Sequence, residues 1–216
     1  MKSEGMNDRN RLFRISFISS KFSVLALAFF AVSFIMEMNE VFTLWLKDDI
    51  PPFTLKLAQY ILLLSITYQY SVGIMAAIQA TGKIRNYQII MGSLLLMNVP
   101  IAYFILKMGY SVYYTTIAFV ILELISLCVR LFMANKLTGM SVKEYIQNVI
   151  QPTMIIIVIP VIVAMIPHFV MSNSFLKLVI VCSIYCLLFA VLMFRFAFDE
   201  GQREHIKSKI QHLLKR

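Results

Sequence analysis

Charged residues are scarce in this sequence. Of its 216 residues, only 14% are Asp, Glu, Lys or Arg, whereas a soluble domain carries about 25%. Hydrophobic residues make up 60% of the chain, and the mean hydropathy is +0.79. Several apolar runs reach the roughly 20 residues that a helix needs to cross a bilayer. The composition therefore disfavours a soluble helical protein with a buried core and predicts an integral membrane protein with several spans.

Sequence patterns of known catalytic sites are also missing. The three histidines, His168, His205 and His212, do not have the spacing of metal ligands. No GxSxG, HExxH or Walker motif occurs. The segment GKIR at 82–85 is not a phosphate-binding loop, because it lacks the pattern GxxxxGK[ST] after a strand. We therefore expect a protein that is not an enzyme, with no catalytic residues, no metal site and no cofactor.

Cysteine is rare too, and the positions of the three cysteines argue against a framework of disulfide bonds. Cys128, Cys182 and Cys186 all lie inside apolar runs, the last two one helical turn apart. Thiols in such surroundings usually serve as packing residues. Nothing in their spacing indicates a disulfide or a metal site.

Six apolar runs are long enough to cross a membrane, and we expect an all-α polytopic fold. Helices suit this setting because each one satisfies its own backbone hydrogen bonds. The predicted spans are about 22–36, 57–80, 87–106, 112–134, 153–171 and 175–198. They are flanked by a polar N-terminal segment, 1–21, and by an amphipathic tail, 199–216. The basic N-terminal segment predicts that no cleavable signal peptide begins at Met1.

The distribution of positive charge predicts the orientation. The formal net charge is +9, which in a soluble protein would suggest nucleic-acid binding. Here the basic residues lie at the two ends and in alternate connections, so we expect membrane lipids and no nucleic acid as partners. Lys83 and Arg85, between the second and third spans, are expected on the cytoplasmic side near lipid phosphates. The rule that cytoplasmic loops are basic then places both termini inside.

Two segments outside the predicted spans are expected to form amphipathic helices on the membrane surface. The sequence SVKE at 141–144 is a capping box. An apolar stripe follows it until Pro152, which favours a separate interfacial helix. The tail 199–216 has a similar stripe with basic residues between its apolar ones. The alternative for the tail is a frayed, solvated end.

Polar residues within the spans are candidates for function, because they are costly in a bilayer. Glu123 lies in the middle of the fourth span, and Arg130 follows two turns later on a similar face. Glu123 either lines an aqueous path or couples to an ion, or it is a protonated packing residue. The sequence leaves these alternatives open.

The second and third spans carry further polar positions. Ser65, Gln69, Gly73 and Ala77 form a stripe at i, i+4 spacing, which is typical of close helix packing and less often of substrate contact. In the third span Asn98 precedes Pro100 by two residues. Because proline removes a backbone donor, we expect a kink there. Gln69 and Asn98 therefore join Glu123 and Arg130 as candidate intramembrane residues.

Four stretches resemble one family of transporters. They are KSEGMNDRNRLFRISFISSKFS at 2–23, LWLKDDIPPFT at 44–54, AIQATGKIRNYQIIMGSLLLMNVPIAYFILKMGY at 77–110 and VRLFMANKLTGMSVKEYIQNVIQP at 129–152. Together they are similar to bacterial polysaccharide and lipopolysaccharide biosynthesis flippases, within the multidrug/oligosaccharidyl-lipid/polysaccharide exporter superfamily. Aligned by these motifs, the chain resembles the last six helices of a fourteen-helix member.

The resemblance implies a function, a partner and a location. It implies a transporter of the bacterial cytoplasmic (inner) membrane that flips a lipid-linked oligosaccharide, for cell-surface polysaccharide such as O-antigen, by alternating access. Because family members have two lobes, it also implies a truncated or split chain, whose remaining helices a separate chain would supply. The alternatives are a six-helix assembly subunit that does not transport, or an exporter of another substrate in the same superfamily.

Overall fold

In a computed structural model, the described residues, 7–47, 50–172 and 174–198, are helical apart from their turns and connections. The helices are α1 (Asn7–Met36), α2 (Met38–Leu46), α3 (Thr54–Gln69), α4 (Val72–Ala80), α5 (Arg85–Leu96), α6 (Asn98–Lys107), α7 (Tyr113–Thr138), α8 (Val142–Tyr145), α9 (Gln151–Val170) and α10 (Phe175–Phe196), with a π-helical turn, η1 (Ile146–Ile150), between α8 and α9. The predicted all-α class is confirmed.

Six helical segments within the described residues are long and apolar enough to cross a membrane, as the sequence predicts. They are Arg9–Met36, Thr54–Ala80, Arg85–Lys107, Tyr113–Thr138, Val142–Val170 and Phe175–Phe196. The expected starts of the second to fourth spans lie within three residues of the observed ones, whereas the first and fifth spans begin much earlier than expected. The predicted tail, 199–216, lies outside the described residues.

The first span corrects the prediction of a polar segment at 1–21. Helix α1 already begins at Asn7, well before residue 22. Arg11 and Arg14 are exposed, but Ser16, Phe17 and Ser20 on the opposite face are buried. The basic residues therefore form the exposed face of a helix that continues into the first span. A count of charges along the sequence does not reveal that the opposite face of this helix is buried.

The fifth span corrects the prediction of a separate interfacial helix at 142–150. Ser141 does cap the helix, since its Oγ accepts a hydrogen bond from the Glu144 backbone at 3.3 Å. The helix then continues through η1 into α9 and runs past Pro152 without a break. A π-helical turn accommodates such an irregularity, and the Thr153 hydroxyl donates to the Val149 carbonyl at 2.7 Å. In the apolar stripe Val149 is buried and Val142 and Ile150 are partly buried against the core, whereas Ile146 is 39% exposed.

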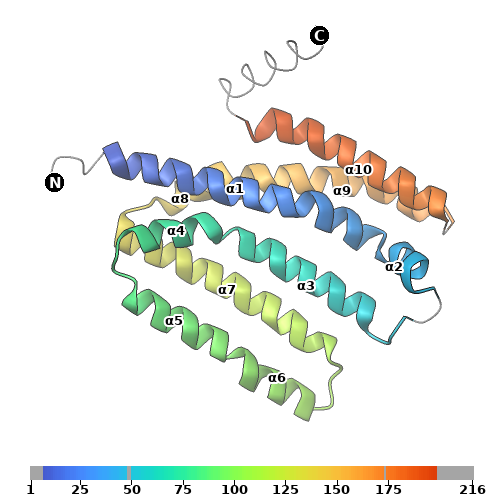
Figure 1. Cartoon of the computed structure of the whole chain (residues 1–216), viewed down its shortest axis with the longest axis horizontal. Coiled ribbons are helices and arrows are strands. Elements are labelled where there is room, and N and C mark those ends of the chain that lie inside the picture. The colour runs from blue at the N-terminus through green and yellow to red at the C-terminus, as the bar shows by residue number, and fades with distance from the viewer. Residues whose placement is uncertain (1–6, 48–49, 173, 199–216) are drawn as a thin grey trace, which may run out of the picture.

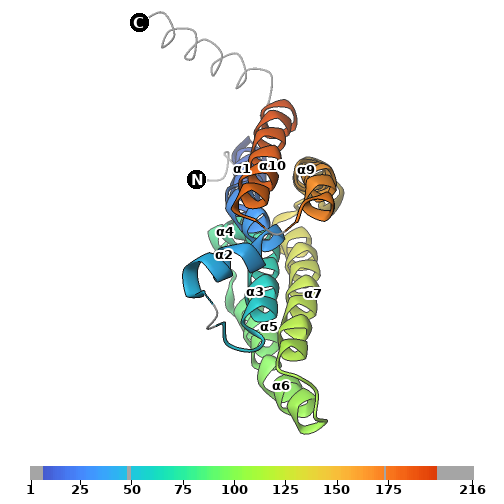
Figure 2. The ribbon, with the colours of Figure 1, turned by 90° about the vertical axis from the view of Figure 1, so that its right-hand side faces the viewer.

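Helix α1 lies at the centre of the arrangement (Figure 1). It contacts α3 and α4 on one side and α9 and α10 on the other. Helix α7 packs against α3 and α4, while α5 and α6 contact α7. Turned by 90°, the helices form a narrow stack with α6 at one end and α10 near the other (Figure 2). Because α5 and α6 occupy an edge, the apolar stretch of 18 residues in their span contains no buried residue.

The connection 81–84 is a short turn between α4 and α5. Gly82 has a φ of +69°, the left-handed conformation that commonly ends a helix. The next helix, α5, begins at Arg85. Lys83 and Arg85 are both exposed. They are therefore free to meet lipid headgroups, and which side of the membrane they face remains a prediction.

A labelling experiment tests that orientation. Cysteine replaces Lys83 at one end of the spans or Tyr110, which is 55% exposed, at the other end, in a chain whose native cysteines are alanines. Because basic connections stay in the cytoplasm, a membrane-impermeant maleimide should label Tyr110→Cys in intact cells and Lys83→Cys only after permeabilisation. Labelling of Lys83→Cys in intact cells would reverse the predicted orientation.

Candidate functional site

A polar pocket lies between α3, α5, α6 and α7, near the middle of three spans. Its volume is about 560 Å³. Its lining includes Leu64, Ser65, Tyr68 and Gln69 from α3, Gln88, Met91, Gly92, Leu94, Leu95 and Asn98 from α5 and α6, and Phe119, Leu122, Glu123, Ser126 and Arg130 from α7. One pocket thus combines amide, hydroxyl and charged groups with leucine and phenylalanine walls.

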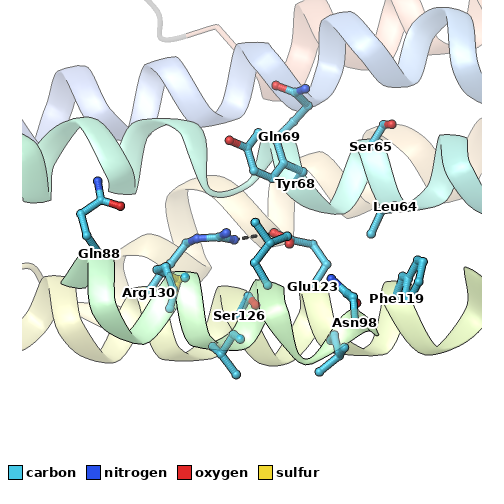
Figure 3. Close-up of a pocket in the computed structure, with 15 residues that line it drawn as sticks. Leu64, Ser65, Tyr68, Gln69, Gln88, Asn98, Phe119, Glu123, Ser126 and Arg130 are labelled. Carbon is cyan, nitrogen blue, oxygen red and sulfur yellow. Dashed lines mark hydrogen bonds and ion pairs between the residues drawn. The ribbon is translucent and has the colours of Figure 1, made fainter. Parts of the chain in front are cut away.

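The charged pair of the pocket comes from one helix. Arg130 lies seven residues after Glu123 on α7, and its Nη1 donates a hydrogen bond to Glu123 Oε1 (Figure 3). The same nitrogen donates a hydrogen bond to Ser71 Oγ at 2.8 Å. The two charged side chains are 9% and 14% exposed. The Tyr68 ring lies 5.6 Å from Arg130 Cζ, a favourable cation–π distance. The arginine is therefore held by a carboxylate, a hydroxyl and an aromatic face.

Ser71 reaches the arginine because the second span is interrupted at Tyr70 and Ser71. The Tyr70 carbonyl accepts hydrogen bonds from Ser20 Oγ at 3.1 Å and from the Tyr145 hydroxyl. The Tyr70 hydroxyl lies 2.9 Å from Thr153 Oγ1. Backbone groups freed inside a membrane need such partners, because lipid offers none. Side chains of α1, α8 and α9 therefore stabilise the break between α3 and α4.

The third span is interrupted at Met97, between α5 and α6. Pro100 accounts for the break, because it has no backbone N–H and its ring clashes with the carbonyl four residues earlier. The kink expected from the sequence is thus present as an interruption. It lies beside Asn98, whose amide lines the pocket.

Two polar atoms of the pocket residues have no hydrogen-bond partner within the described part of the chain. They are Asn98 Oδ1 and Arg130 Nε, and both atoms are buried. Such atoms are rare in proteins, because an unpaired buried polar group is costly. One is an acceptor and the other a donor. Both atoms belong to residues that line the pocket, so each could pair with a polar ligand once its side chain turns toward the cavity.

The structure brings together four of the residues selected from the sequence. Gln69, Asn98, Glu123 and Arg130 all line this pocket, although they come from three spans. Lys83 and Arg85 do not; they lie in and after the connection between α4 and α5. The pocket gathers the intramembrane candidates, whereas the two basic residues stay at the surface.

The stripe at 65, 69, 73 and 77 divides at the helix break. Ser65 and Gln69 line the pocket, whereas Gly73 and Ala77 are buried. A Cβ at Gly73 would lie 1.9 Å from the Ser16 carbonyl oxygen, so α4 and α1 are in backbone contact there. Close helix packing therefore applies to Gly73 and Ala77, whereas Ser65 and Gln69 line a cavity.

Sequence reasoning missed other polar residues of the pocket. Ser126 lies three residues after Glu123 and four before Arg130, so helical spacing alone would place it on the same face. Gln88 lies one turn before Gly92, which also lines the pocket. Ser71 had no such signal, because its position depends on the break in the helix.

The lining indicates what the pocket can bind. Hydrogen-bonding groups and a neutralised ion pair suit an uncharged or amphipathic polar ligand better than a bare ion. In the residues that the structure describes, no group of three or more His, Cys, Asp or Glu side chains is placed to hold a metal ion. Comparisons of the chain with family models, with curated proteins and with solved structures found no match.

Proposed function

We propose that this chain is part of a transporter that moves a lipid-linked oligosaccharide across the bacterial cytoplasmic membrane, for the export of cell-surface polysaccharide. In this proposal the polar pocket holds the hydrophilic part of the substrate. The motifs at 2–23, 44–54, 77–110 and 129–152 suggest the substrate class by resemblance. The chain would be part of a multi-pass membrane protein that works by alternating access, and membrane lipids would surround it.

The observation that carries the proposal is the polar pocket near the middle of three apolar helical segments. Polar and ionised groups within spans are costly, and they most often mark a path for a substrate or an ion. Here Gln69, Asn98, Glu123 and Arg130 converge from three spans on one volume of about 560 Å³. Amide and hydroxyl groups suit the many hydroxyls of a sugar, while the leucine walls suit its lipid carrier.

The interrupted helices support the same function. Transporters commonly build their binding sites at broken helices near the bilayer midplane. The second span is interrupted at Tyr70 and Ser71 and the third at Met97, and both breaks lie next to residues of the pocket. A pocket bounded by two broken helices can change shape more easily than one bounded by continuous helices.

Ligand binding tests the role of the pocket. In Asn98→Leu the unpaired Oδ1 acceptor is lost, so binding of a fluorescent lipid-linked oligosaccharide to the chain in lipid nanodiscs should weaken about tenfold, the effect of losing one buried hydrogen bond. The matched control is Ser93→Leu, because Ser93 is exposed on the same span and bonds only to the Ile89 carbonyl. Its affinity should equal that of the wild type.

Translocation in proteoliposomes then separates a transporter from an assembly subunit. Under the proposal, the chain, alone or with a co-purifying chain, moves the labelled lipid between leaflets, and Asn98→Leu slows this movement. Binding without movement in either preparation would favour the non-transporting subunit. Equal binding by both variants, or preference for a lipid without sugar, would contradict the role of the pocket.

A further inference from the structure

A second polar cluster lies at the opposite end of the spans from the connection 81–84 (Figure 1). Glu37 occupies the junction of α1 and α2, and Glu40 follows on α2. His168 is in the last turn of α9, and Lys177 is in the first turn of α10. We call these four residues the junction quartet. They connect helices that are more than 130 residues apart in the sequence.

Glu37 is the centre of the junction quartet. Its side chain is fully buried, yet both carboxylate oxygens lie near other polar groups. Oε1 is 2.7 Å from His168 Nδ1, and Oε2 is 3.8 Å from Lys177 Nζ. That ammonium donates a hydrogen bond to Glu40 Oε1 at 3.1 Å instead. Glu37 Oε2 accepts no hydrogen bond from the described residues, so histidine is its main hydrogen-bonding partner.

The formal charges of the junction quartet do not balance. Counted formally, its two carboxylates and one ammonium would give a net charge of −1 with a neutral imidazole. An excess of charge within a buried group of side chains is costly, and one added proton would remove it. Imidazole is the side chain that changes charge between about pH 5 and 8. The His168 side chain is 27% exposed, whereas Glu37 is completely covered. The imidazole is therefore the point at which a proton can enter.

The other titratable groups near this pair cannot take its place. Burial raises the pKa of the Glu40 carboxyl, but a backbone hydrogen bond, the Lys177 ammonium and a contact with the Glu37 side chain outweigh it, so that the pKa lies below its ordinary value. Glu40 is therefore already ionised where imidazoles titrate. The Lys177 ammonium is paired with Glu40, whereas the His168 imidazole is in direct contact with Glu37.

We propose that the Glu37–His168 pair is a proton-binding site, loaded from the aqueous phase at this end of the spans, and that proton uptake tightens the attachment of α9 and α10 to α1 and α2. With a neutral imidazole, α9 is joined to Glu37 by a hydrogen bond in which only the carboxylate carries a charge. With the imidazolium, the same contact is also an ion pair, so the attraction between α9 and Glu37 increases. The proposal does not depend on the proposed function.

Hydrogen exchange in lipid nanodiscs tests the site. Exchange is measured by mass spectrometry between about pH 5 and 8, the range of imidazole titration, and corrected for the intrinsic effect of pH. Amides near Glu37 and near His168 should become about fivefold more protected at the acidic end, as the hydrogen bond between these side chains becomes an ion pair as well. A wild-type chain with no pH response in these segments would overturn the proposal.

Two substitutions and a control assign the response to this histidine. In His168→Gln the side chain stays neutral, so protection should be low at every pH. In His168→Arg a permanent cation faces Glu37, so protection should be high at every pH. The control is the double variant His205→Gln, His212→Gln, which removes the other two histidines of the chain and should respond like the wild type. A response that persists in His168→Gln, or that disappears in the control, would overturn the proposal.

Discussion

Replacing Gly73 by alanine should lower the free energy of unfolding by about 3 kcal/mol or more, at the upper end of the cost of overpacking. The added Cβ would lie 1.9 Å from the Ser16 carbonyl oxygen and 2.7 Å from Ser20 Oγ. The nearest obstacle is backbone, so it cannot rotate away as a side chain would. Helix α4 must then move away from α1, which also lengthens the 3.0 Å hydrogen bond from the Gly73 N–H to Ser20.

The measurement is the loss of the folded state in detergent micelles with increasing denaturant. Gly92→Ala is the matched control, because it is also a glycine inside a spanning helix but has open space around its Cβ position. Alanine there should leave stability unchanged or raise it by about 0.5–1 kcal/mol, the usual preference of a helix for alanine. Equal losses in the two variants would show that α1 and α4 do not pack as closely as described.

Replacing Arg130 by methionine should lower the free energy of unfolding by about 3–5 kcal/mol, the usual cost of breaking a buried ion pair. Methionine fills much of the volume but leaves the Glu123 carboxylate without its cation, in a span where lipid cannot solvate it. Ser71 loses its hydrogen bond from Nη1 as well. The same unfolding measurement checks this value.

A double variant shows whether the loss comes from the stranded carboxylate. Replacing a whole buried ion pair by apolar side chains is often close to neutral. Arg130→Met combined with Glu123→Met should therefore be more stable than Arg130→Met alone. If the double variant is the less stable of the two, the ion pair is not what holds Arg130 in place. Stability is the right measurement here, because both variants should lose the proposed ligand binding.

Hydropathy predicted much of the fold because it acts locally. Each span is apolar over the length that a bilayer requires, so all six could be found without knowing how they pack. The break at Met97 was predictable for the same reason, since Pro100 causes it within one helix. The convergence of Gln69, Asn98, Glu123 and Arg130 was predictable only in part. Their polarity marked them, but their common pocket depends on α5 and α6 packing beside α7.

Features that depend on distant partners could not be predicted. The break at Tyr70 and Ser71 contains neither proline nor glycine, and its stabilising hydroxyls come from other helices. Glu37 looked like part of a charged connection after the first span, yet it is buried because His168 lies beside it. The early start of α1 was hidden for a similar reason. Its buried face is defined by contact with α4, which no local pattern reveals.

The break in the second span also constrains the order of assembly. The Tyr70 carbonyl can receive its bond from Ser20 as soon as the second span enters the membrane, since Ser20 precedes it in the chain. The Tyr145 hydroxyl follows 75 residues later, and Thr153 follows 83 residues later. During synthesis on the ribosome, the second span must therefore wait for the third, fourth and fifth before all the hydrogen bonds of Tyr70 can form.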